Sequence, residues 1–174
     1  MNTAMRQRVI GIGLALAIFF LDQWIKGLMV GPLDLKLQPG GTIELLPFFD
    51  LRWTENYGVS LGMLTAKTME MRWLLVLLTG AIAVFVCVWM LREKATGDIL
   101  ALALILGGAL GNIRDRVLYG YVIDYADLHF GSFRPFLIFN LADAAITIGV
   151  LIILARTLLS REKPETVSHD APES

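Results

Sequence analysis

Residues 107–144 read GGALGNIRDRVLYGYVIDYADLHFGSFRPFLIFNLADA, and this stretch decides how the rest of the chain is organised. It begins and ends in apolar sequence of helical character. A charged group costs about 2.5–3.5 kcal/mol at the centre of a membrane span on insertion scales, so such groups need a partner or a function. The stretch nevertheless carries many polar side chains, among them Asn112, Arg114, Asp115, Arg116, Asp124, Asp127, Asn140 and Asp143.

The composition is that of a membrane protein. Of the 174 residues, 56% are hydrophobic and 18% are charged, against about a quarter charged in an average soluble domain. The net charge of −1 gives no basic face for nucleic acid, so none is expected as a partner. The single Cys87 excludes an internal disulfide and a CxxC metal site, while His129 and His169 lie too far apart to suggest zinc. We therefore expect no metal and no cofactor.

Apolar segments at about 9–29, 73–91, 98–116 and 136–159 are predicted to cross the membrane as helices. The first follows arginines as a signal peptide does. It is long enough to span a bilayer and no small-x-small cleavage pattern follows it, so we expect it to be retained. We predict a single domain over residues 1–160, followed by a polar tail at 161–174 that we expect to be disordered.

Residues 31–71 differ in character, with a turn at 39–41 and short predicted strands at 42–46 and 49–53. Strand edges exposed to lipid would leave backbone groups unpaired, so this segment must rest at the membrane surface. The predicted fold is an all-α membrane protein, a bundle of four transmembrane helices with a small extracytoplasmic β-sheet cradle. Lysines and arginines gather at both termini and in the 92–97 turn, which places both termini in the cytoplasm and the 31–71 segment in the periplasm.

The polar residues suggest a site at the outer ends of the last two helices. Asn140 and Asp143 are three apart and are predicted to share a helix face. Asn112 and Arg116 are four apart on the third helix, just after the Gly107-x-x-x-Gly111 pair that allows another helix to approach closely.

Several residues leave alternatives open. Asp124 and Asp127 both lie between the third and fourth helices and compete for the role of second carboxylate, although either alone is more typical of a turn. Asp22 and Lys26 are four apart and are predicted to form a structural ion pair. Asn56-Tyr57-Gly58 is either a simple turn or part of the site.

Two carboxyl groups held close together suit peptide hydrolysis where histidine, cysteine and metal are lacking. They cannot both ionise, so one keeps its proton and polarises the substrate carbonyl while the other activates water. A serine–lysine protease using Ser60 and Lys26 is a rival interpretation, although Asp22 opposes a neutral lysine. A transporter with a proton path through Asp143 and Asp22, and a lipoprotein chaperone without catalysis, are further alternatives.

The polar residues also form motifs that are unspecific singly and very specific together, and that cover nearly the whole chain. They are Asp22-Gln23-x-x-Lys26, Asn56-x-Gly58, Gly107-Gly-Ala-x-Gly-Asn112-x-x-Asp115-Arg116, Val122-x-Asp124-Tyr125 and Phe139-Asn140-x-Ala142-Asp143.

With these motifs the chain resembles the lipoprotein signal peptidases, or type II signal peptidases. The resemblance implies an aspartyl endopeptidase of the bacterial inner membrane that works near the periplasmic face. Its expected substrates are prolipoproteins, cut just before a cysteine that carries diacylglycerol, and membrane lipids surround it. The cyclic peptide globomycin is an expected inhibitor, and we expect a monomer.

The resemblance also implies residue roles. The catalytic pair corresponds to Asp124 and Asp143, which favours Asp124 over Asp127. Two positions depart from the family pattern. Leu61 stands where an aromatic residue is common, and Arg114 stands where an apolar or aromatic residue is usual. The residues expected to line or support the site are Asn56, Gly58, Asn112, Arg116 and Asn140, and those expected to be structural are Asp22, Lys26 and Asp115.

Overall fold

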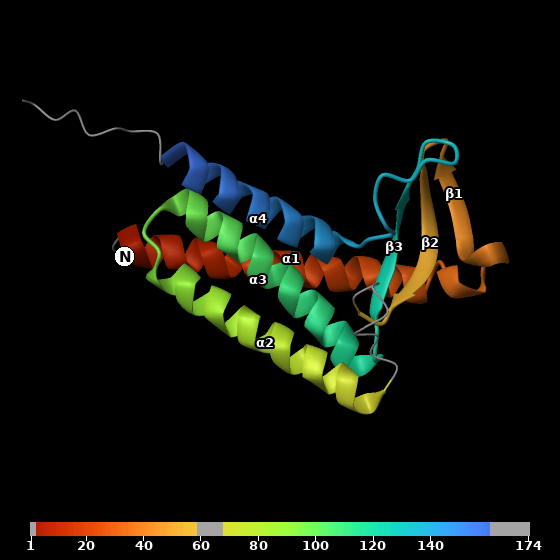
Figure 1. Ribbon diagram of the computed structural model, residues 1–174, viewed down its shortest axis with the longest axis horizontal. Coiled ribbons are helices and arrows are strands. Elements are labelled where there is room, and N and C mark those ends of the chain that lie inside the picture. Colours follow the sequence, from red (N-terminus) through yellow and green to blue (C-terminus); the bar gives the residue numbers. More distant parts are fainter. Residues whose placement is uncertain (1–2, 59–67, 161–174) are drawn as a thin grey trace, which may run out of the picture.

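Long helices packed side by side, with a small sheet at one end, make up the computed structural model, which describes residues 3–58 and 68–160 (Figure 1). Four of the helices in these residues are long and apolar enough to cross a membrane. The predicted four-span bundle with a small sheet is therefore confirmed. The helices are α1 (Thr3–Val30), α2 (Met69–Arg92), α3 (Thr96–Leu118) and α4 (Leu141–Ser160).

The sheet is antiparallel with strand order β1-β2-β3. Strand β1 (Thr42–Leu46) lies as predicted, and β2 (Phe49–Asn56) extends further than predicted because it pairs along its length with a third strand. That strand, β3 (Val122–Leu128), comes from the connection between α3 and α4, where no strand was predicted from the sequence. Two short 3₁₀ turns, η1 (Leu35–Leu37) and η2 (Pro39–Gly41), join α1 to β1.

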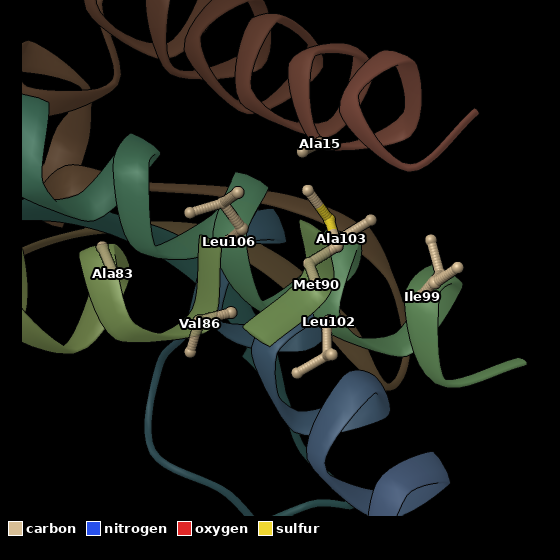
Figure 2. Packing of buried hydrophobic residues seen from close by; sticks show 8 residues of the cluster. All are labelled: Ala15, Ala83, Val86, Met90, Ile99, Leu102, Ala103 and Leu106. Carbon is tan, nitrogen blue, oxygen red and sulfur yellow. The ribbon is translucent and has the colours of Figure 1, made fainter. Parts of the chain in front are cut away.

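The strands run across the direction of the helices, and the first residues of α1 and the last of α4 lie at the end of the bundle away from the sheet (Figure 1). The buried apolar cluster at that end comes from α1, α2 and α3 (Figure 2). It is closely packed, and Met90, Leu102 and Ala103 are fully buried. The sheet end of the bundle, by contrast, holds the buried polar side chains.

Helix α3 lies at the centre of the bundle and packs against the other helices. Its glycines lie where neighbouring backbone comes closest. A Cβ added at Gly107 would lie 2.5 Å from the carbonyl oxygen of Ala15 on α1, and one added at Gly108 would collide with the carbonyl oxygen of Ala142 on α4. The close approach predicted from the glycine spacing is therefore present, and it brings three helices together beside the sheet.

The start of α4 differs from the sequence prediction. The predicted segment began at residue 136, whereas the helix begins at Leu141. Before it, Phe139 pairs its backbone with Ala126 of β3 through bonds of 2.8 and 3.1 Å, which keeps this segment extended. Asn140 and Asp143 consequently do not share a helix face, and Asn140 instead caps the helix.

Replacing Gly107 by Ala should destabilise the bundle. The new methyl group meets backbone that cannot rotate away, so α1 and α3 must separate, at a cost of about 1–3 kcal/mol. Gly80→Ala on α2 is the matched control, because nothing lies within 4 Å of its Cβ position. Thermal unfolding of both variants in detergent micelles measures the difference, and equal midpoints would contradict the proposed close contact.

Candidate active site

Two acidic side chains from different elements meet where β3 passes the start of α4. Asp124 lies within β3, and Asp143 lies in the first turn of α4. Asn140 bonds to both of them. Its side-chain N–H donates to Asp124 Oδ1 at 2.6 Å, and its backbone N–H donates to Asp143 Oδ2 at 3.3 Å. The Asn140 side-chain oxygen accepts the backbone N–H of Asp143 at 2.9 Å, which completes a reciprocal helix cap.

Each acid also has a further asparagine of its own. Asn112 of α3 donates to Asp143 Oδ1 at 2.8 Å, and Asn56 at the end of β2 donates to Asp124 Oδ2 at 3.0 Å. The side-chain oxygen of Asn56 accepts the N–H of Gly58 at 3.0 Å, so the amide group is held from both sides. Gly58 has φ of 130°, a conformation that side chains disfavour. The predicted supporting residues are therefore gathered around the acids.

The two acids differ in their surroundings. Asp124 is 1% exposed, whereas Asp143 is only half-buried. Burial removes water from the Asp124 carboxylate and, with a further contribution from the nearby charge of Asp143, raises the pKa of Asp124 to about 7. Two adjacent carboxyls with unequal burial are the arrangement in which one keeps a proton at neutral pH.

A buried ion cluster, formed by Lys26, Asp22 and Asp115, contacts the side-chain oxygen of Asn112. The Lys26 ammonium of α1 contacts Asp22 Oδ2 at 2.9 Å, Asp115 Oδ2 at 2.8 Å and Asn112 Oδ1 at 3.0 Å. Lys26 is 2% exposed and both aspartates are 0% exposed. The predicted pair of Asp22 and Lys26 is present, but it is more deeply buried than a surface pair and has Asp115 as a third member.

The ion cluster also holds the segments that carry the two acids. Asp22 Oδ1 accepts the backbone N–H of Ala142 at 3.1 Å, and Asp115 Oδ2 accepts that of Ile123 at 3.3 Å. Ala142 precedes Asp143, and Ile123 precedes Asp124. The cluster therefore fixes the backbone on which each acid stands.

Two further residues hold the site together, although the sequence alone assigned no role to either. Gln23 donates to Asp22, to Asp115 and to the carbonyl of Gly111 at 3.1–3.2 Å. Tyr125 accepts the backbone N–H of Leu141 at 3.2 Å through its hydroxyl oxygen. Both residues lie inside the motifs quoted in the sequence analysis, and that position was the one sequence feature that could have indicated a role in the site.

Arg116 lies beside the acids with part of its guanidinium unused. Its charge acts on both Asp143 and Asp124. Its Nη1 reaches the Asn112 carbonyl at 3.4 Å, and its Nε is buried and has no hydrogen-bond partner among residues 3–58 and 68–160. Arg72 of α2 donates to the Arg116 carbonyl at 2.7 Å and so anchors the end of α3.

Asp127 does not join the acid pair. It lies three residues after Asp124 on β3, and side chains alternate along a strand, so the two face opposite sides of the sheet. Arg134 contacts Asp127 at 3.1 Å and Arg52 contacts it at 3.7 Å. These contacts give Asp127 a role in holding the connection that leads to α4.

An apolar pocket of about 290 Å³ opens beside Asp143 on α4. Apart from Asp143 and Thr147, its walls are apolar. The pocket is lined by Phe136, Leu137, Phe139, Asp143, Ala144, Thr147 and Ile148.

Three other residues that the sequence analysis named lie away from this pocket or outside the described structure. Arg114 bonds to Gln23, while Ser60 and Leu61 lie outside the described residues.

Comparison with known proteins agrees with this arrangement. The lipoprotein signal peptidase of Sphingopyxis alaskensis is 58% identical over 153 residues, which are 88% of this chain and 87% of that protein. The lipoprotein signal peptidase of Rhizorhabdus wittichii is 54% identical over 155 residues, 89% of each chain. A solved bacterial membrane enzyme, 28% identical, superposes with a TM-score of 0.75 over 90% of this chain and 92% of its own.

The family model for signal peptidase (SPase) II matches residues 14–159, which include both acids, the ion cluster and every asparagine of the site. With this match and the high identity to its relatives, the chain belongs to the signal peptidase II family and is a membrane protease that processes lipoproteins.

Proposed function

We propose that Asp124 and Asp143 form a catalytic pair that cleaves diacylglyceryl-modified prolipoproteins just before the lipidated cysteine. The observation that carries the proposal is that Asn140 bonds to both carboxyls at once. A polar group buried in an apolar bundle is costly unless it is paired, and within residues 3–58 and 68–160 each acid has asparagine partners and no ion pair. Such a site keeps two acids close while leaving their chemistry available.

In the proposed mechanism Asp143 is ionised and Asp124 carries the shared proton. Asp143 is the more exposed acid, and it lies in the first turn of α4, where the helix dipole favours negative charge. Asp124 is buried in a strand, and its pKa of about 7, well above the ordinary value of an aspartate, lets it keep a proton up to neutral pH. These differences support one division of roles over the other.

Hydrolysis then proceeds by water addition. Asp143 takes a proton from water, whose oxygen attacks the peptide carbonyl, while the Asp124 proton moves to the carbonyl oxygen. In the second step the C–N bond breaks, Asp143 returns its proton to the leaving amine, and one hydroxyl of the intermediate gives its proton back to Asp124. Both acids recover their starting state, and one water is consumed.

Arg116 and the apolar pocket suit the rest of the substrate. The free Nε of Arg116 can donate to a substrate carbonyl beside the acids. The pocket on α4 opens at Asp143 and has apolar walls, which fits the lipid part of the modified cysteine. By this proposal the chain works as a monomer in the bacterial inner membrane, with both termini cytoplasmic and the site near the periplasmic face. It is inhibited by the cyclic peptide globomycin.

A serine–lysine mechanism is disfavoured by the contacts of Lys26. A lysine base needs a free lone pair, whereas Lys26 forms buried ion pairs with two carboxylates within 3 Å. A proton path along the helices is disfavoured as well, because the buried polar groups gather at the sheet end.

Replacing either acid by its amide should abolish processing. Asp124→Asn removes the proton donor and Asp143→Asn removes the base, so each should slow cleavage by about 10²–10⁴-fold. The measurement is a gel-shift assay on a diacylglyceryl-modified precursor. Asp127→Asn is the matched control and should remain active, because Asp127 faces the arginines instead. Normal cleavage by either active-site variant would remove that residue from the mechanism.

The rate of cleavage should fall as pH rises above about 7, because Asp124 must keep its proton and its pKa lies near 7. Asn56 donates to Asp124 and thereby stabilises its charged form. Asn56→Ala should therefore raise the pKa of Asp124 and move the alkaline limb up by about one pH unit. The pH profile under saturating substrate measures this, and a limb that moves down would contradict the assignment of the proton.

Asn140 has two roles that mutation can separate. Asn140→Ser keeps an oxygen that can cap α4 but loses the N–H donated to Asp124. Asn140→Ala loses both. Activity should fall in both variants, whereas stability should fall by about 0.5–2 kcal/mol more in the alanine variant, because only that variant also loses the cap. Activity assays together with thermal unfolding test this, and full activity of the serine variant would show that the Asp124 contact is dispensable.

A further inference from the structure

The proposed reaction makes no use of Lys26, although it is the charged centre of the buried ion cluster. An ammonium group has three N–H donors and no acceptor. Each donor of Lys26 has one oxygen at 2.8–3.0 Å, from Asp22, Asp115 and Asn112. The first two are carboxylates that would neutralise it. The third is a neutral amide that also bonds to Asp143.

The contact with Lys26 decides which way the Asn112 amide faces. Since the ammonium can only donate, the group it meets must be the amide oxygen of Asn112 and not the amide nitrogen. The Asn140 side chain also donates to this oxygen, at 3.2 Å. Two donors therefore hold the oxygen on one side, and the Asn112 N–H groups must point the other way, toward Asp143 Oδ1 at 2.8 Å.

Resting on the proposed function, we propose that Lys26 is a positioning residue for the reaction. It holds the amide of Asn112 so that its N–H is donated to Asp143, and it thereby stabilises the ionised form of that acid. The positive charge behind the amide oxygen also polarises the amide, which makes the N–H a stronger donor. Lys26 acts through Asn112 and needs no contact with substrate.

Charged groups face Asp143 from several elements. Asp124 on β3 and Arg116 on α3 each interact with its charge. A variant of Lys26 also removes the positive partner of Asp22 and Asp115, so a variant of Asp22 is needed to separate the two effects. The titratable and charged groups near Asp143 are Asp22 and Lys26 on α1, Asp115 and Arg116 on α3, and Asp124 and Tyr125 on β3.

The test compares Lys26→Met and Lys26→Gln in the full-length protein in detergent–lipid micelles. In Lys26→Met the Asn112 amide loses one of the two donors that fix its orientation and the charge that polarises it, so ionised Asp143 loses stabilisation and the acid limb of the pH–activity profile should move up by about one pH unit. Glutamine can still donate an N–H to the Asn112 oxygen, so Lys26→Gln should show a smaller upward shift. An unmoved acid limb in both variants would overturn the proposal.

Asp22→Asn is the control for a purely structural role. It disturbs the same cluster but removes a negative charge and leaves the contact between Lys26 and Asn112 intact. Its acid limb should stay in place or move down. An upward shift equal to that of Lys26→Met would mean that the cluster acts only through stability, and would overturn the proposal.

Thermal unfolding of each variant establishes that the measured enzyme is folded. If Lys26→Met does not fold, Lys26→Gln decides the test. The loss of the positive charge in that variant should by itself move the acid limb of the pH–activity profile upward. Failure of the proposed function would appear instead as normal cleavage by Asp143→Asn. Failure of the positioning role would appear as an inactive Asp143→Asn beside an unmoved limb in the Lys26 variants.

Discussion

The polar end of the bundle depends on one ammonium ion that cannot be left unpaired. A charge in an apolar bundle needs a partner for each of its donors. Lys26 obtains them from two helices, and its carboxylate partners in turn bind the backbone of Ala142 and Ile123. The satisfaction of one charge thus fixes α1, α3, the start of β3 and the start of α4 relative to one another. The acids follow immediately on those two backbone positions.

The rest of the bundle allows this cluster to form. Glycines along α3 bring its neighbours close at the sheet end, and the other end is filled by a closely packed apolar cluster. A Cβ at Gly111 would lie 2.5 Å from Asp22 Oδ2, so the small residue makes space for the charge itself. The glycine spacing and the buried ions therefore depend on each other, because closely approaching backbones bring short polar side chains within hydrogen-bonding reach.

Much of this arrangement could be predicted because membrane spans leave strong signals. Long apolar runs predict helices, and the polar residues interrupting them predict where a site lies. The pairing of β3 with β2 could not be predicted, since it joins segments far apart in the sequence. The cap at Asn140 was missed for a related reason: residues 136–139 are apolar like a helix, and only their pairing with β3 keeps them extended. Gln23 has no distinctive pattern of its own, so the three bonds that it donates appear only in the folded chain.

The difference between the two acids arises from backbone rather than from side-chain chemistry. Asp143 lies in the first turn of a helix, where free N–H groups and the helix dipole favour negative charge, and it opens onto a pocket. Asp124 lies in a buried strand, whose dipole is small and whose surroundings exclude water. The same residue type therefore has different surroundings at two positions in one site. A segment that changes from strand to helix between Asp124 and Asp143 supplies that asymmetry without any histidine, cysteine or metal in the proposed mechanism.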